Sequence, residues 1–240
     1  MFDRIASVYD LMNSTMTAGL HHRWRARAAD LARLRGGGRA LDVATGTGDL
    51  AFELAARTGD DGLVVGVDFS EGMLARARAK ARGREHRGSV RFEWADAASL
   101  PFPDHAFDAV TVGFGARNFE DFPRCLSEMV RVLRPGGRVV ILEITTPRRP
   151  PLSSFHRLWF DRAVPQLGRL AAAAQSLSLR AEQIDGEGVA AAYTYLPSSV
   201  KRWYSPQALA AEMERASLSQ IAWITTAGGI VAIHSATVVE

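Results

Sequence analysis

Three apolar stretches in the first half of the chain each carry an aspartate at or near their end. These are Asp42 in RALDVAT, Asp68 in GLVVGVD and Asp96 in SVRFEWAD. Two glycines, Gly46 and Gly48, follow the first stretch directly and flank a threonine. A carboxylate at the end of a strand can accept hydrogen bonds from sugar hydroxyls, and glycine lets a ligand approach the backbone closely. The pattern predicts a binding site for a nucleoside-like ligand.

The glycine-rich stretch GTGDLA, residues 46–51, differs from loops that bind phosphate. A nucleoside triphosphate loop requires G-x-x-x-x-G-K-[ST], but no lysine follows here and Asp49 would repel phosphate. The dinucleotide fingerprint G-x-G-x-x-G/A tolerates Ala51 in the third place, so spacing alone does not exclude it. Asp42, inside the preceding strand, together with this loop favours a cationic ligand, whose ammonium or sulfonium group prefers carboxylates and carbonyls.

The two later aspartates narrow the ligand further. Asp68 is placed to accept both hydroxyls of a ribose with a free 2′-OH. Asp96 is placed to accept from the exocyclic amine of adenine. A glycine loop, a ribose acid and an adenine acid in succession, without a phosphate anchor, indicate S-adenosylmethionine. The alternative is that Asp68 and Asp96 only cap the turns after their strands.

Strands and helices alternate over the first 147 residues. Buried strands are predicted at 39–45, 62–68, 89–96, 107–114 and 138–144. Ser70 and Ser205 are each expected to cap the helix that follows, and RPGG at 134–137 is expected to end another helix. Two further strands close the chain and are expected to be antiparallel. This order predicts an α/β fold, a doubly wound Rossmann-like sheet of seven strands with the last one antiparallel.

The length of 240 residues and an apolar content of 47% favour one domain over residues 1–240. Residues 1–35 are expected to form a helical segment over the active site. After Pro147 the alternation breaks, and residues 148–204 are expected to form a helical cap or substrate insertion.

Composition excludes several classes of partner and site. The net charge is only +3, and arginines are scattered along predicted helices, so no nucleic-acid partner is expected. The single cysteine, Cys125, cannot form an internal disulfide and favours a reducing, cytoplasmic location. The histidines lack the spacing of metal ligands, so no metal is expected. No apolar run reaches the ~18 residues of a membrane span.

Longer motifs run through nearly the whole chain. In order they are FDRIASVYDLMN, GLHHRWR, LDVATGTGD, GVDFSEGML, ADAASLPFPD, GFGARNFED, VLRPGGRVVILEITTP, YTYLPSSV and GGIVAIH. With them the chain resembles the class I methyltransferases, and more narrowly the quinone-biosynthesis C-methyltransferases. The resemblance implies methyl transfer from S-adenosylmethionine to a ring carbon of a polyprenyl quinol, demethylmenaquinol. Alternative readings are the ubiquinone-precursor benzoquinol, another small or lipid acceptor, and a non-catalytic subunit that binds the cofactor.

The resemblance also places the cofactor contacts. They fall on Thr47, Asp68, Asp96 and Ala97. Gly113 stands where the family often has a serine, so we expect a cofactor-site position without that side-chain contact. Two departures, the stretch 171–192 and the end of the chain, bear on the acceptor more than on the chemistry.

Catalytic candidates follow from the chemistry of the acceptor. The donor methyl is already electrophilic, whereas a ring carbon attacks only once a neighbouring hydroxyl loses its proton. In GFGARNFED, Arg117 could hold the developing phenolate and Asn118 could orient a water or hydroxyl. The alternative is that Arg117 pairs with an acid such as Glu120 on the surface.

Three further candidates lie in the segments expected to cover the sheet. Tyr9 and Asp10 could fold over the cofactor, and helix packing and capping is their alternative. His156, in SFHRLWFDRAVPQL, lies in a stretch that could admit an isoprenoid tail or contact a membrane surface peripherally, or simply pack on the sheet. The sequence leaves the oligomeric state open, a homodimer included.

Overall fold

The structure is a computed structural model that describes residues 17, 19–83, 89–147 and 198–239. The expectations for Tyr9, Asp10 and His156 lie outside these residues. So does most of the expected cap at 148–204. Of the expected segment 1–35, the structure describes residue 17 and residues 19–35.

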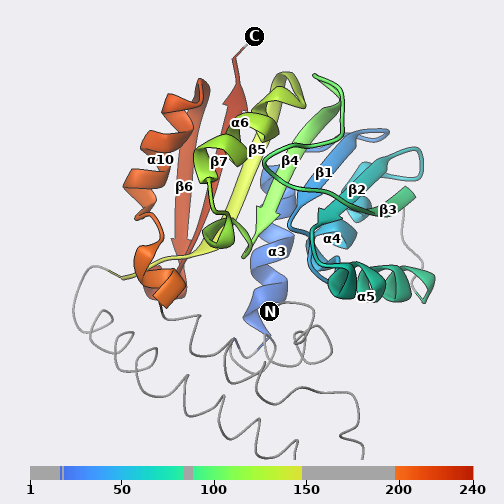
Figure 1. Ribbon diagram of the computed structural model, residues 1–240, viewed down its shortest axis with the longest axis horizontal. Coiled ribbons are helices and arrows are strands. Elements are labelled where there is room, and N and C mark those ends of the chain that lie inside the picture. The colour runs from blue at the N-terminus through green and yellow to red at the C-terminus, as the bar shows by residue number, and fades with distance from the viewer. Residues whose placement is uncertain (1–16, 18, 84–88, 148–197, 240) are drawn as a thin grey trace, which may run out of the picture.

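A seven-stranded sheet forms the centre of the molecule, in the order β3-β2-β1-β4-β5-β7-β6 (Figure 1). Its strands are β1 (Arg39–Val43), β2 (Leu63–Asp68), β3 (Ser89–Trp94), β4 (Phe107–Gly113), β5 (Leu133–Ile144), β6 (Leu218–Thr226) and β7 (Val231–Val238). The first five strands are parallel, and β7 is antiparallel to both of its neighbours. This confirms the predicted doubly wound sheet and its antiparallel last strand.

Helices cover both faces of the sheet. They are α3 (Leu20–Leu31), α4 (Asp49–Thr58), α5 (Glu71–Arg82), α6 (Phe122–Arg131) and α10 (Pro206–Arg215), with the short 3-10 helices η1 (Ala116–Asn118) and η4 (Ala227–Gly229). Side chains of α3, α4 and α5 share one apolar core with the sheet, and those of α6 and α10 share the other. In β1, Leu41 and Val43 join the core under α6, whereas Ala40 joins the core under α4. Burial on both faces explains the continuous apolar runs of these strands.

Hydrogen-bonding side chains begin the helices where the sequence predicted them. The Ser70 hydroxyl accepts from the backbone N–H of Met73, and Ser205 caps α10 in the same way. Helix α6 ends at Arg131, just before the RPGG motif that was expected to end it. The strand that follows begins at Leu133 and not at the predicted residue 138. Leu133 pairs with Phe107 and Arg138 pairs with Ala109, so residues 134–137 form a bulge inside β5.

The outermost strand β6 carries an irregularity of its own. Its pairing with β7 shifts register between Ser219 and Ala222, and Gln220 lies in the left-handed region with φ 50°. An extra residue of this kind interrupts the ladder and bends the strand.

The carboxyl ends of β1, β2, β4 and β5 meet at one edge of the sheet, the lower edge in Figure 1. From β1 the chain passes to α4 on one face, and from β4 it passes through η1 to α6 on the other. Such a divergence between neighbouring strands is where open α/β sheets bind ligands. The candidate site is therefore at the carboxyl ends of β1 and β4.

Candidate active site

The loop after β1 turns sharply and leaves its backbone open at one point. Gly46 and Gly48 have positive φ angles, 56° and 86°. A Cβ at Gly48 would lie 2.7 Å from the Phe92 ring, so this glycine permits close packing. At Gly46 a Cβ would meet no atom of the described residues within 4 Å. The backbone at Gly46 is thus free to be approached by a ligand, as a glycine loop requires.

Asp42 lies beneath this loop and not on its outer surface. Asp42 is only 1% exposed. One oxygen accepts from Thr45 Oγ1 at 2.7 Å and the other from Thr111 Oγ1 at 2.6 Å. Burial is the main reason that the pKa of Asp42 rises from its ordinary 3.8 to about 6. Asp42 therefore joins the loop to β4, and its burial argues against the expected direct contact with a cationic ligand.

Asp68 ties two loops together at the end of β2. Its oxygens accept from the backbone N–H of Gly46 at 2.8 Å and of Ser70 at 2.9 Å. Each carboxylate oxygen has two lone pairs and can accept more than one hydrogen bond, as an acid that holds a ribose at a strand end requires. Asp68 therefore caps the turn after β2, and its position also agrees with the predicted binding of ribose hydroxyls.

Asp96 is exposed at the end of β3 and begins a tight turn. One of its oxygens accepts from the backbone N–H of Ala98 at 2.8 Å. Ala97, between them, is half-buried against the core under α6. Asp96 thus also caps its turn, and within the described chain its second oxygen receives no hydrogen bond, which leaves it open to an amine donor.

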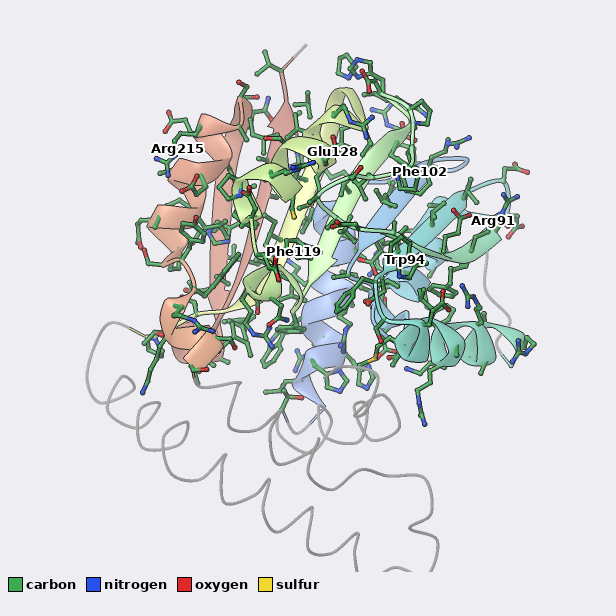
Figure 2. All side chains as sticks on the ribbon, in the orientation of Figure 1. Arg91, Trp94, Phe102, Phe119, Glu128 and Arg215 are labelled. Atoms are coloured by element: carbon green, nitrogen blue, oxygen red, sulfur yellow. The ribbon has the colours of Figure 1, made fainter. Side chains whose placement is uncertain are left out.

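Two exposed aromatic residues accompany these acids, and the sequence reasoning missed both. Phe69, next to Asp68, is 63% exposed, and Trp94, two residues before Asp96, is 56% exposed. Trp94 is the last residue of β3 (Figure 2), and its indole N–H donates to the Phe69 carbonyl at 2.9 Å, which holds the two residues together. Exposed flat rings beside two strand-end acids suit a nucleobase, and their position directly next to the acids was the available signal.

The charge of Asp49 is balanced within the protein. Lys80 Nζ donates to Asp49 Oδ1 at 2.9 Å and to the Thr47 hydroxyl at 2.8 Å. Arg25 lies 3.7 Å from the other oxygen of Asp49. The expected attraction of the loop for a cationic ligand therefore cannot rest on Asp49. Lys80 anchors the predicted contact Thr47 from α5, a helix that begins more than twenty residues later.

The described part of the expected amino-terminal segment reaches this edge. Arg25 of α3 hydrogen-bonds with His21 and lies over the Phe114 ring, 5.6 Å from its centroid. Phe114 follows β4 directly and has φ 60°, a left-handed conformation rare for a bulky residue. Helix α3 thus packs beside the start of η1.

Arg117 forms a buried ion pair with Glu143, whereas the alternative in the sequence analysis was a surface pair with an acid such as Glu120. Its Nη1 donates to Glu143 Oε1 at 2.7 Å and to the Phe114 carbonyl at 2.6 Å. The backbone N–H of Arg117 donates to Glu143 Oε2 at 3.2 Å. The side chain of Arg117 is 10% exposed and that of Glu143 is 2% exposed. Glu143 was not singled out from the sequence, although this acid lies near the end of an apolar stretch, like Asp42, Asp68 and Asp96.

Two buried polar atoms of η1 lack a partner within the described chain: Arg117 Nε and Asn118 Oδ1. Such atoms cost about 1 to 3 kcal/mol each when they stay unpaired, so they mark a place for a ligand. One is a donor and the other an acceptor, a pair that a hydroxyl group satisfies. A Cβ at Gly115 would lie 2.6 Å from that of Ala44, which places η1 directly against the glycine loop.

Gly113 ends β4 beside the same loop. A Cβ there would lie 3.0 Å from Leu50 Cδ2 in the first turn of α4. A serine side chain at 113 would therefore press on Leu50. The glycine lets α4 approach β4, which accounts for the loss of the side-chain contact expected at this position.

The described residues contain no cluster of three or more His, Cys, Asp and Glu side chains that could hold a metal ion. Burial raises the pKa of the Cys125 thiol to about 12, so this cysteine is a packing residue. No helix in the described part of the chain has the length and apolar character to cross a membrane.

Replacing Asp68 tests the ribose site. In Asp68→Asn one acceptor becomes an NH2 group, so Gly46 N, Ser70 N and the ribose hydroxyls compete for one oxygen. We expect the affinity for S-adenosylhomocysteine to fall tenfold or more in calorimetry. Asp61→Asn is the matched control, because Asp61 is exposed just before the other end of β2. Unchanged affinity in folded Asp68→Asn would contradict the assignment.

Replacing Asp42 tests the buried carboxylate. Because its pKa is raised to about 6 in the folded protein, its contribution to stability is present below pH 4 and is lost as pH rises through 6. The shift corresponds to about 3 kcal/mol. Asp42→Asn cannot ionise, so relative to wild type its free energy of unfolding should rise by up to that amount between pH 4 and 7.5. Urea titrations at both pH values measure this, and a pH-independent difference would contradict it.

Comparison with known proteins agrees with this geometry. The sequence model described as the ubiE/COQ5 methyltransferase family matches residues 1–238. A demethylmenaquinone methyltransferase of Thermus thermophilus is 46% identical over 235 residues, which are 98% of this chain and 98% of that protein. A ubiquinone/menaquinone biosynthesis C-methyltransferase UbiE of Geobacter sulfurreducens is 40% identical, covering 98% of this chain and 86% of its own.

Solved structures share the fold. The crystal structure of a SAM dependent methyltransferase from Aquifex aeolicus superposes with a TM-score of 0.58 at 19% identity, covering 86% of this chain and 85% of that one. The full-length family match makes S-adenosylmethionine the methyl donor, and the open backbone at Gly46 beside Asp68 fits it. The chain belongs to the ubiE/COQ5 methyltransferase family.

Proposed function

We propose that this protein transfers a methyl group from S-adenosylmethionine to a ring carbon of demethylmenaquinol, a polyprenylated quinol, and so forms menaquinol. The full-length similarity to the Thermus thermophilus protein carries the choice of acceptor, since that relative is named for demethylmenaquinone alone. Relatives named for both quinones are 36 to 40% identical, which keeps the benzoquinol as the second candidate.

The donor is held at the carboxyl ends of β1, β2 and β3. Asp68 accepts from the ribose hydroxyls, and Asp96 accepts from the adenine amine beside Ala97. The exposed rings of Phe69 and Trp94 border the adenine. The loop around Gly46 and Gly48, supported by Asp42 from below and by Thr47, receives the methionine part. Bound in this way, S-adenosylmethionine supplies an electrophilic methyl group.

The chain's own work is to orient the acceptor and to stabilise the charge that develops on it. In the proposed arrangement the acceptor hydroxyl donates to Asn118 Oδ1 and accepts from the Nε–H of Arg117. As this hydroxyl loses its proton, the hydrogen bond from Arg117 strengthens, because the acceptor oxygen becomes an anion. Electron density passes to the ring carbon, which forms the new carbon–carbon bond to the methyl group while the methyl–sulfur bond breaks and S-adenosylhomocysteine is the leaving group. That carbon then loses its own hydrogen as a proton, and the ring becomes aromatic again.

Tyr9 and Asp10 remain proposed catalytic residues, as candidates to accept the proton that leaves the hydroxyl. A polyprenyl tail partitions into lipid, which supports peripheral contact of the protein with the inner face of the cell membrane. A homodimer remains a prediction.

Isotopic methyl transfer tests the proposal directly. The protein is given S-adenosylmethionine with a labelled methyl group and either demethylmenaquinol or the demethylated benzoquinol, both kept reduced. We expect label on the naphthalene ring carbon and a higher kcat/KM for demethylmenaquinol. A higher kcat/KM for the benzoquinol would reverse the choice of acceptor. Binding of S-adenosylhomocysteine without turnover of either quinol would favour the non-catalytic reading.

Arg117→Lys tests the proposed hydrogen bond to the acceptor. Lysine can still pair with Glu143, but it has no planar fork and no second donor to replace Nε. Loss of one oxyanion donor lowers kcat by roughly a hundredfold, whereas the affinity for S-adenosylhomocysteine should hardly change. Raising the pH should recover part of the rate, because more acceptor then ionises without help.

The matched control is Arg215→Lys, which alters an arginine paired with Glu212 on α10 (Figure 2). Its kcat should equal that of the wild type. A normal kcat in Arg117→Lys would leave Arg117 as a packing and ion-pair residue.

A further inference from the structure

Glu143 is a buried acid at the carboxyl edge to which the proposed reaction gives no role. It precedes Ile144, the last residue of β5, and its side chain is 2% exposed. Burying a carboxylate carries a penalty of several kcal/mol unless it is paired and hydrogen-bonded. Its contacts show where that compensation comes from.

Within the described residues, the Glu143 carboxylate accepts three hydrogen bonds, and they come from η1 and from the end of β5. Oε1 accepts from Arg117 Nη1 at 2.7 Å and from the backbone N–H of Ile144 at 2.8 Å. Oε2 accepts from the backbone N–H of Arg117 at 3.2 Å. The carboxylate therefore holds both the main chain and the side chain of Arg117.

The support beneath this contact is rigid. Glu143 pairs with Ala232 of β7, and Leu142 before it pairs with Gly113 of β4, so the acid sits on a central strand. A planar guanidinium whose Nη1 is fixed by two acceptors, Glu143 Oε1 and the Phe114 carbonyl, has little freedom left in the direction of its Nε–H. That N–H is the buried donor without a partner in the described chain.

The pair also sets the local charge. Without Glu143, Arg117 would place a full positive charge beside the acceptor. That charge would lower the pKa of the acceptor hydroxyl, and it would also stabilise the resulting phenolate strongly. A strongly stabilised phenolate is a weaker carbon nucleophile, because its electron density is held on oxygen. With Glu143 at 2.7 Å the pair is neutral, and the acceptor meets a directed N–H donor with little net charge behind it.

We infer that Glu143 is a positioning residue of the reaction: it aims the Nε–H of Arg117 at the acceptor oxygen and cancels the arginine's charge there. This inference rests on the proposed function, because it assumes that the acceptor oxygen lies at Arg117 Nε. The inference predicts that removing the charge of Glu143 lowers the pKa of the acceptor hydroxyl. A purely structural role for Glu143 would not predict this direction.

The test compares Glu143→Gln and Glu143→Asp with the wild type. Glutamine keeps the shape and one acceptor but removes the charge, so the site gains one positive charge. The acidic limb of the kcat–pH profile should move to lower pH by about two units, which is the order expected for a unit charge ~6 Å from the group at an effective dielectric of about 20. At the plateau kcat should fall about tenfold, and KM for S-adenosylmethionine should stay unchanged. Aspartate keeps the charge but is shorter, so kcat should fall while the limb stays in place.

A second readout does not depend on turnover. The phenol 4-nitro-1-naphthol, whose anion absorbs visible light, is titrated in complex with the protein and S-adenosylhomocysteine. Its pKa in the Glu143→Gln complex should be about two units lower than in the wild-type complex. Glu128→Gln is the matched control, since Glu128 also pairs with an arginine at 2.7 Å but lies on α6 away from the carboxyl edge (Figure 2). It should match the wild type in both readouts.

The outcomes separate this inference from the proposed function. Wild-type protein that does not methylate demethylmenaquinol contradicts the proposed acceptor, and the naphthol titration then decides on Glu143 by itself. Wild-type turnover with an unmoved pH limb and an unmoved naphthol pKa in Glu143→Gln overturns the inference and leaves Glu143 as a tether of η1. If Glu143→Gln fails to bind S-adenosylhomocysteine, Glu143→Asp decides: a kcat equal to the wild type overturns the inference, and a lower kcat with normal KM for the donor supports it.

Discussion

The carboxylate of Asp68 is the contact on which the candidate site depends most. From the end of β2 it accepts the backbone N–H of Gly46 in one loop and of Ser70 at the start of the next helix. The loop after β1 and the beginning of α5 are thereby held in one arrangement before any ligand arrives. A site fixed in this way loses less conformational entropy when it binds. The position of the open backbone at Gly46 follows from this bond.

Two more strands carry, near their carboxyl ends, an acid that accepts hydrogen bonds from separate segments of the protein. Asp42 and Glu143 are nearly inaccessible to solvent, and protein donors occupy their oxygens. Desolvation of each acid is offset by hydroxyl groups in one case and by Arg117 in the other. Asp49 and Glu143 are paired with cations inside the protein, so the site offers a ligand the carboxylates of Asp68 and Asp96, a directed N–H donor and aromatic faces. A donor with a single diffuse positive charge and a largely apolar acceptor suit such surroundings.

Much of the fold could be predicted because its signals are local. Strands buried on both faces appear as apolar runs, and Ser70 and Ser205 mark helix starts through bonds that span only three residues. The partner of Arg117 was not local. The alternative role for Arg117 named a nearby acid such as Glu120, three residues on, whereas the actual partner lies 26 residues away. Only the register of β4 against β5 brings the two together, and one sequence does not reveal that register.

Lys80 and Phe69 were missed for related reasons. A lysine on a helix usually points to solvent, and nothing in its spacing says that it reaches Asp49 across 31 residues. The exposure of Phe69 depends on how β2 and β3 end together. Glu143 is different, because an acid at the end of an apolar run is the signal that identified Asp42 and Asp68. Applying that rule to every strand would have found it.

The interruption in β6 has a consequence for how copies of this protein can associate. An outermost strand with a regular row of free N–H and C=O groups invites a neighbouring chain to extend the sheet. In β6 the left-handed Gln220 and the slipped register after Ser219 break that row near its start. A strand from a second molecule would find donors and acceptors out of step and could continue the ladder only briefly. Pairing of two copies through β6 is therefore disfavoured.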